Sequence, residues 1–160
     1  MEFVQLFDMQ AQLDSFIEET QNIDRDVFKE KSLALLVELA ELSNETRCFK
    51  FWSTKGPSKR EIILEEFVDS IHFMLSLGNM KGFVLTSWPT ATNSMDLTEA
   101  FLKTTAFIIQ FIEQPIKTNY DAIWEAYATL AYNLSFTLDD IIGAYIEKNE
   151  KNYERQRTGY

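Results

Sequence analysis

The chain has 160 residues and a formal net charge of −10, with 15 Lys and Arg against 25 Asp and Glu. This acidic balance argues against broad binding to nucleic acid or to an anionic membrane surface. No stretch reaches the ~18 apolar residues of a membrane span, and the N-terminus lacks the pattern of a secretion signal. We therefore expect a soluble, cytoplasmic protein that forms one domain over residues 1–160.

Helix-breaking residues are few, since the chain has only five Gly and three Pro. Apolar residues recur three or four positions apart, as in an amphipathic helix, and no long stretch alternates with period two. The pattern predicts an all-α bundle of about five helices, over residues 3–20, 26–47, 62–77, 95–113 and 118–148. The longest connection is expected before residue 95, where residues 83–88 could pack as a short apolar strand or turn.

The connection after the second expected helix contains the strongest turn signals. Gly56 and Pro57 interrupt the apolar pattern, and Ser58 can cap the third helix with Glu61 at the capping-box position. Gly78 follows the last residue expected in that helix. These signals predict a short loop between two neighbouring helices.

Two pairs of carboxylates flank this loop. Glu38 and Glu41 are three residues apart, as are Glu66 and Asp69, so each pair projects from one face of its helix. If the two helices pack antiparallel, the four carboxylates converge, and converging anions resist ionisation unless a cation neutralises them. Carboxylate oxygens without Cys or His clusters suit Mg²⁺, with Mn²⁺ as a substitute. The pattern predicts a metal site between these helices; the alternative is four solvated acids on exposed faces.

The segment between the two carboxylate pairs is basic. Residues 46–60 contain no acid and five basic side chains, which are Arg47, Lys50, Lys55, Lys59 and Arg60. Basic side chains beside a divalent cation can hold the oxygens of a polyphosphate. The segment therefore indicates a nucleotide or another phosphate ester as ligand, or else a solvated loop whose charges offset its acidic flanks.

The last fourteen residues, EKNEKNYERQRTGY, have no apolar stripe strong enough to hold them in a core. They are rich in Asn, Gln, Arg and Tyr, whose side chains form directed hydrogen bonds or stack on rings. We expect residues 147–160 to form a mobile tail that can fold over a bound ligand.

Three stretches resemble motifs of one family, the dimeric all-α dUTP pyrophosphatases, within the wider MazG-like all-α NTP pyrophosphatases. ELAE at 38–41 and EFVD at 66–69 are similar to the ExxE…ExxD metal motif of the wider group. QAQLD, which begins at Gln10, resembles a QxxLN element and departs from it at Asp14, where asparagine is usual. The tail is similar to the pattern KNxxNxxRQxxGY, with matches at Lys148, Asn149, Asn152, Arg155, Gln156, Gly159 and Tyr160.

The resemblance implies Mg²⁺-dependent hydrolysis of dUTP, and also of dUDP, by attack of a metal-activated water on the α-phosphorus, and it implies a homodimer. By the same resemblance, Glu38, Glu41, Glu66 and Asp69 ligate the metal, and Glu41 is also the general base. The residues implied in substrate binding are Gln10 and Trp52 at the uracil, Phe73 at the deoxyribose, and Lys148, Asn152, Arg155 and Lys55 around the phosphates. Tyr160 of the tail motif is also implied in substrate binding.

Other assignments stay open at this stage. Trp52 and Phe73 can instead be core aromatics, and His72 is taken as a structural residue. The departure at Asp14 leaves room for an all-α pyrophosphatase that acts on another nucleotide. A helical regulatory or binding protein without catalysis is the alternative from a different class.

Overall fold

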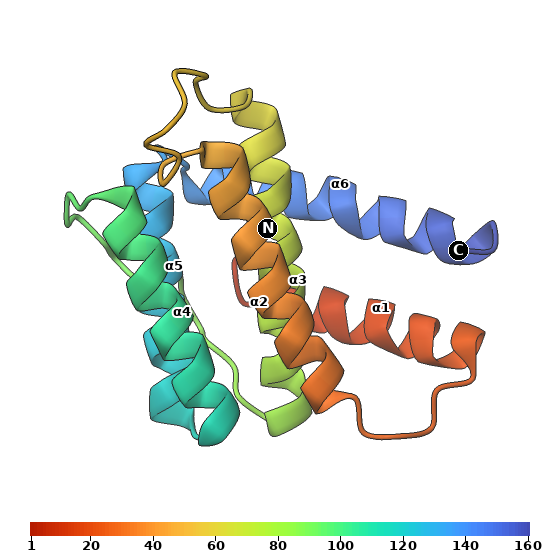
Figure 1. Ribbon diagram of the computed structural model, residues 1–160. Coiled ribbons are helices and arrows are strands. Elements are labelled where there is room, and N and C mark those ends of the chain that lie inside the picture. Colours follow the sequence, from red (N-terminus) through yellow and green to blue (C-terminus); the bar gives the residue numbers. More distant parts are fainter.

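The computed structural model describes residues 1–160 and contains six α-helices and no strand (Figure 1). The expected all-α class is therefore confirmed. The helices are α1 (Gln5–Gln21), α2 (Phe28–Thr46), α3 (Arg60–Lys81), α4 (Leu97–Glu113), α5 (Lys117–Asn133) and α6 (Leu138–Arg157). The helices α2 to α5 stand side by side, and α1 and α6 lie next to each other and run across them.

The single helix expected over residues 118–148 is two helices, α5 and α6. After α5 the chain turns through Ser135, which has a left-handed φ of 60°, and Phe136 is buried. Thr137 then caps α6 because its hydroxyl accepts a hydrogen bond from the Asp140 N–H at 3.1 Å, and its own N–H donates to the Asp140 carboxylate at 2.8 Å. The apolar spacing continues through this turn, so periodicity alone did not reveal it.

Helix α6 also includes most of the expected tail and ends at Arg157. Lys148 and Asn149 are buried, while the residues after them are half-buried or exposed. The outer turns of α6 lie beside α1, where the Gln21 amide donates a 2.7 Å hydrogen bond to Gln156. This hydrogen bond holds the outer end of α6, which contains most of the expected tail, beside α1.

Helix α3 continues one turn beyond its expected end and stops at Gly82, which has a φ of 72°. Gly78 lies inside the helix because a larger residue does not fit there. A Cβ atom at this position would lie 2.1 Å from the Tyr120 hydroxyl oxygen of α5. The glycine at position 78 therefore makes room for the Tyr120 side chain of α5 against α3 and does not end a helix.

The start of α3 also differs from expectation. Its N-cap is Lys59, and no side chain caps the first turn. The Ser58 hydroxyl instead hydrogen-bonds to the Glu45 carboxylate, and the Ser58 N–H donates to the Glu45 carbonyl at 3.0 Å. Ser58 therefore ties the loop back to α2.

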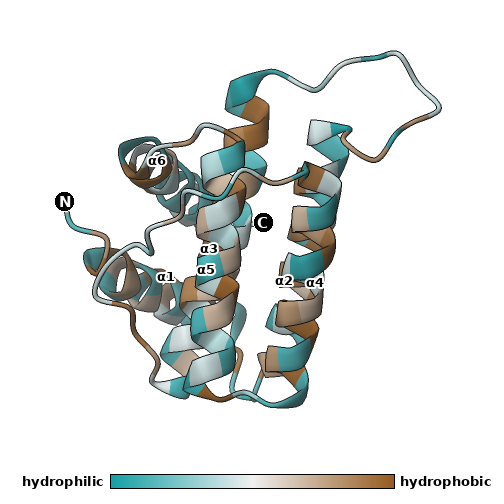
Figure 2. Cartoon of the chain, turned by 90° about the vertical axis from the view of Figure 1, so that its left-hand side faces the viewer, coloured by the Kyte–Doolittle hydropathy of each residue, from teal (hydrophilic) through white to brown (hydrophobic).

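Residues 83–96 form an irregular connection without a strand. Trp88 anchors it, since its ring lies 5.6 Å from that of Phe3 and 6.0 Å from that of Trp124 in the core. Apolar and polar residues share the surface of each helix, as Figure 2 shows, and the apolar sides meet in one core. None of the six helices combines the length and the hydropathy that crossing a membrane requires.

Candidate functional site

Helices α2 and α3 run antiparallel and bring three acidic side chains together (Figure 1). One carboxylate oxygen from each of Glu38, Glu66 and Asp69 lies within 4.8 Å of the others. Glu41, the fourth member of the predicted quartet, is exposed and lies outside this group. It is still close enough to Glu38 for the two carboxyl groups to share a hydrogen bond.

The surroundings of these acids favour their protonated forms. Burial raises the pKa of Glu38 to about 8, and the hydrogen bond that protonated Glu38 donates to Glu41 and the charges of Asp69, Glu41 and Glu66 add to the shift. Burial and the charges of Asp69 and Glu41 raise the pKa of Glu66 to about 7. Burial also raises the pKa of Asp69, against the opposing effect of Lys148. The Oε2 atom of Glu38 is buried without a hydrogen-bond partner. A set of clustered carboxylate oxygens like this one fits a hard divalent cation.

In EDTA, the protein should lose stability as the pH rises from about 6.5 to about 8. The folded-state pKa values of Glu38 and Glu66, about 8 and 7, lie above the ordinary value of 4.5, so the folded chain binds more protons than the unfolded chain in this range. Below about 6.5 the effect of His72 is opposite, because burial lowers its pKa to about 3. Melting temperatures measured across this range test the prediction.

A matched variant isolates the acidic group in this measurement. The double substitution Glu38→Gln and Glu66→Gln should flatten the pH dependence, since neither amide titrates. Saturating Mg²⁺ should also oppose the loss of stability in the unsubstituted protein, because the cation binds the deprotonated carboxylates of the folded state. A melting temperature that rises with pH in EDTA would contradict the expectation.

A cavity of about 390 Å³ lies beside the acidic group, among α1, α2, α3 and α6. Eight of the twelve predicted site residues line it, and these are Gln10, Glu38, Asp69, Phe73, Lys148, Asn152, Arg155 and Tyr160. They come from four helices and from the C-terminus, so the fold gathers them from distant parts of the sequence. Glu41, Glu66, Trp52 and Lys55 are not in the cavity wall.

Helix α6 brings positive charge to the acidic end of this cavity. Lys148, Asn152 and Arg155 are spaced by four and three residues and share one face of the helix. The Lys148 ammonium lies 2.9 Å from an Asp69 oxygen and 3.3 Å from a Glu65 oxygen. Its side chain is only 10% exposed, and these two carboxylates raise its pKa despite its burial.

The basic loop between α2 and α3 lies away from the cavity. Trp52 is 64% exposed, and its ring lies 5.2 and 6.1 Å from the rings of its neighbours Phe51 and Phe49. Lys55 is exposed too, and its carbonyl accepts a 3.1 Å hydrogen bond from the Arg47 side chain, which helps to hold the loop. The expected roles of Trp52 and Lys55 at the ligand therefore stay predictions.

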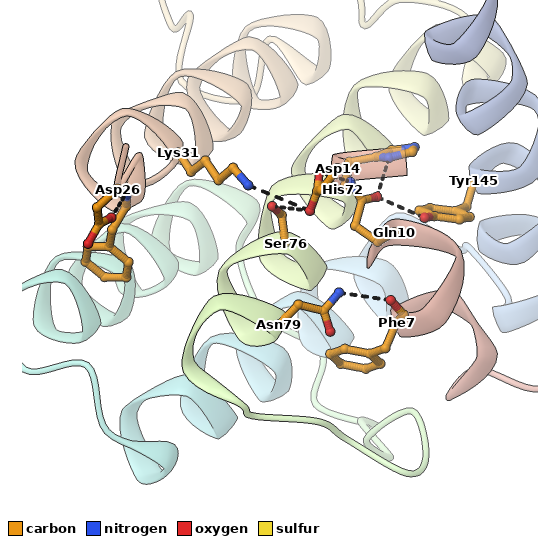
Figure 3. A network of polar contacts seen from close by, with 10 residues as sticks. Phe7, Gln10, Asp14, Asp26, Lys31, His72, Ser76, Asn79 and Tyr145 are labelled. Atoms are coloured by element: carbon orange, nitrogen blue, oxygen red, sulfur yellow. Dashed lines mark hydrogen bonds and ion pairs between the residues drawn. The ribbon is translucent and has the colours of Figure 1, made fainter. Parts of the chain in front are cut away.

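A network of buried polar side chains forms another part of the cavity wall (Figure 3). The Gln10 amide nitrogen donates to Asp14 at 2.9 Å, while its oxygen accepts from the Tyr145 hydroxyl at 2.9 Å and lies 2.7 Å from His72 Nδ1. The rings of His72 and Tyr145 stack with centroids 4.3 Å apart. His72, predicted to be structural, thus orients the amide of a candidate binding residue.

Asp14 connects this network to two further helices. Its second carboxylate oxygen accepts from the Ser76 hydroxyl at 2.6 Å and lies 3.7 Å from the Lys31 ammonium. The sequence reasoning singled out neither Ser76 nor Lys31. Ser76 is seven residues after Asp69 and so lies on the same face of α3, a signal that the spacing contained. No local spacing connects Lys31 of α2 with α1.

Comparison with protein families gives an independent result. Residues 2–160 match a family model described as dUTPase. A comparison with curated proteins finds no match. The family match covers all of the chain except its first residue, and the fold is entirely helical. The chain therefore belongs to the dUTPase family and is an all-α dUTP diphosphatase.

Proposed function

We propose that the protein cleaves dUTP at the α-phosphorus to give dUMP and pyrophosphate, that it also accepts dUDP, and that it requires Mg²⁺, for which Mn²⁺ can substitute. One observation supports this most strongly. A single cavity has carboxylates suited to a hard cation on α2 and α3 and is also lined by Lys148, Asn152 and Arg155 of α6, whose side chains can donate hydrogen bonds to phosphate.

Glu38, Glu66 and Asp69 would hold the metal, with Glu41 as a fourth ligand. When bound, the cation lowers the pKa of the attacking water and stabilises negative charge on the phosphate oxygens. Glu41 is also the general base in this proposal, and its carboxylate accepts the proton that the water loses. Its exposed position next to Glu38 leaves the side chain free to turn toward substrate.

The remaining residues bind and orient the nucleotide. Lys148, Asn152 and Arg155 donate hydrogen bonds to phosphate oxygens, and such bonds from charged donors are among the stronger ones in proteins. Phe73 packs against the deoxyribose, and Gln10 faces the uracil. Trp52 and Lys55, on the loop between α2 and α3, also contact the nucleotide in this proposal. Tyr160, which follows α6, contacts it too, and its ring lies 5.1 Å from the Arg155 guanidinium.

We also propose a cytoplasmic homodimer. The single cysteine, Cys48, excludes an internal disulfide and fits a reducing compartment. A groove of about 430 Å³ between α2 and α4 is lined mostly by apolar residues, including the exposed Phe49, Leu102 and Ile109. An equivalent surface on a second copy would remove this groove from water. Light scattering should give twice the chain mass of 18.7 kDa, and a monomeric mass would refute the dimer.

Pyrophosphate release from dUTP, dTTP, dCTP and dATP, each with Mg²⁺ and with EDTA, tests the proposed reaction. We expect release from dUTP that needs the metal. Metal-dependent release from another nucleotide instead would keep the metal site and overturn the base assignment. No release from any of the four would favour a binding or regulatory role for this chain.

Two arginines on the last turns of α6 provide a matched pair of variants. Arg155→Ala should raise the KM for dUTP by roughly 10- to 100-fold, the effect of losing one hydrogen bond from a charged donor. Arg157→Ala should leave the KM unchanged, because Arg157 pairs with Glu150 at 3.1 Å on the surface and does not line the cavity. Steady-state kinetics measures both, and equal effects would remove Arg155 from the phosphate site.

A further inference from the structure

Lys148 of α6 lies between two carboxylates of α3. Its ammonium is 2.9 Å from Oδ1 and 3.0 Å from Oδ2 of Asp69, and it is 3.3 Å from Oε1 of Glu65. Glu65 and Asp69 are four residues apart, so both project from the face of α3 that packs against α6. Asp69 belongs to the candidate metal group, and Glu65 does not.

The two oxygens of Asp69 cannot serve the ammonium and a divalent cation equally. Both partners are positive and both depend on the same oxygens, so they repel each other when they share them. The Asp69 side chain is only 15% exposed, and little water is there to screen this repulsion. Because Asp69 is proposed to ligate Mg²⁺, Lys148 needs a second carboxylate that the cation does not use.

Glu65 has the position that such a partner requires. It is not in the cavity wall, whereas Lys148 is, so Glu65 can hold the ammonium beside the cavity without competing for the ligand. Its side chain is 46% exposed and already pairs with Lys148. It also accepts a hydrogen bond from Lys151 at 3.5 Å, on the same face of α6. Glu65 therefore fixes the ends of two lysine side chains, and only one of them contacts Asp69.

We propose that Glu65 is a positioning residue for Lys148, whose ammonium it holds at the phosphate-binding end of the cavity when a divalent cation engages the Asp69 oxygens. A lysine side chain is long and flexible, so a free one loses much rotamer entropy when it binds phosphate. Glu65 removes part of this loss in advance. The inference rests on the proposed function, in which Lys148 donates to phosphate and Asp69 ligates the metal.

Simple electrostatics predicts the opposite effect of Glu65 on nucleotide binding. A carboxylate near a triphosphate repels it, so removal of the carboxylate would tighten binding. This repulsion is weak for a half-exposed side chain and is screened by salt. The rotamer entropy of one lysine can change affinity by up to roughly 30-fold. We therefore expect the restraint of Lys148 to outweigh the repulsion.

Glu65→Gln tests the restraint. Calorimetry with the non-hydrolysable analogue α,β-imido-dUTP at saturating Mg²⁺ should show binding weakened by roughly 3- to 30-fold, although the protein has lost a negative charge. Glu61→Gln, exposed one turn earlier on the same helix, is the control and should leave the affinity unchanged. In the Lys148→Met background, Glu65→Gln should no longer weaken binding, because no ammonium is left to position.

The shared use of the Asp69 oxygens is tested with Mn²⁺ alone. Lys148→Met should raise the affinity for Mn²⁺ by roughly 5-fold or more in calorimetry, since it removes a competitor for Asp69. Lys151→Met is the matched variant, because Lys151 pairs with Glu65 but not with Asp69. It should change the affinity for Mn²⁺ much less.

Unchanged or tighter nucleotide binding by Glu65→Gln would overturn the inference. So would an affinity for Mn²⁺ that Lys148→Met does not raise, or that Lys151→Met raises equally. If Lys148→Met does not fold, the sign of the Glu65→Gln effect decides alone. Wild-type protein that hydrolyses no dUTP with Mg²⁺ would instead overturn the proposed function on which the inference rests.

Discussion

Glu41→Gln should lower kcat for dUTP by roughly 10²- to 10⁴-fold, the usual contribution of a general base. The amide cannot accept the proton of the attacking water, and it is a weaker ligand for a hard cation than a carboxylate. The fold should persist because Glu41 is exposed on α2. Its charge also raises the pKa values of Glu38 and Glu66, so its removal reduces repulsion among the acids. Single-turnover kinetics with saturating Mg²⁺ and dUTP measures the chemical step.

A control is needed for the loss of one negative charge from an exposed helix. Glu113→Gln, at the exposed end of α4 and away from the cavity, should keep normal kcat. The melting temperature of Glu41→Gln in EDTA should be equal to or slightly above that of the unsubstituted protein. Normal turnover by Glu41→Gln would show that a different group accepts the proton.

Gly78→Ala should destabilise the protein by about 2–4 kcal/mol. The added Cβ would lie 2.1 Å from the Tyr120 hydroxyl oxygen and 2.7 Å from the Phe83 carbonyl oxygen, so both a buried ring and backbone must move. The movement would also disturb the 2.7 Å hydrogen bond from the Tyr120 hydroxyl to the Met74 carbonyl in the core. The better helix propensity of alanine offsets only about 1 kcal/mol of this cost. Urea unfolding gives the free energy of unfolding.

Gly143→Ala provides the matched comparison, since Gly143 also lies inside a helix but has no atom within 4 Å of an added Cβ. It should stabilise the protein by up to about 1 kcal/mol, the difference in helix propensity between alanine and glycine. Opposite signs for the two variants would show that contact with α5 determines the cost at position 78. A stabilising effect of Gly78→Ala would disprove the close packing of α3 on Tyr120.

Local sequence patterns were sufficient to predict much of this protein. Apolar spacing predicted the helical class because side chains three and four apart lie on one face of any α-helix. The same rule paired Glu38 with Glu41 and Glu66 with Asp69. The tail motif pointed to the dUTPase family, which the family match confirmed.

Only the tertiary structure decided how these faces meet. It divided the last expected helix at Ser135, brought Glu38, Glu66 and Asp69 together without Glu41, and placed Trp52 outside the cavity. Asp14, the position where the resemblance failed, acquired partners from α2 and α3 that no spacing in the sequence connects to it. Such contacts depend on the packing of whole helices, which is set by many side chains at once, whereas periodicity reports only the neighbours along one helix.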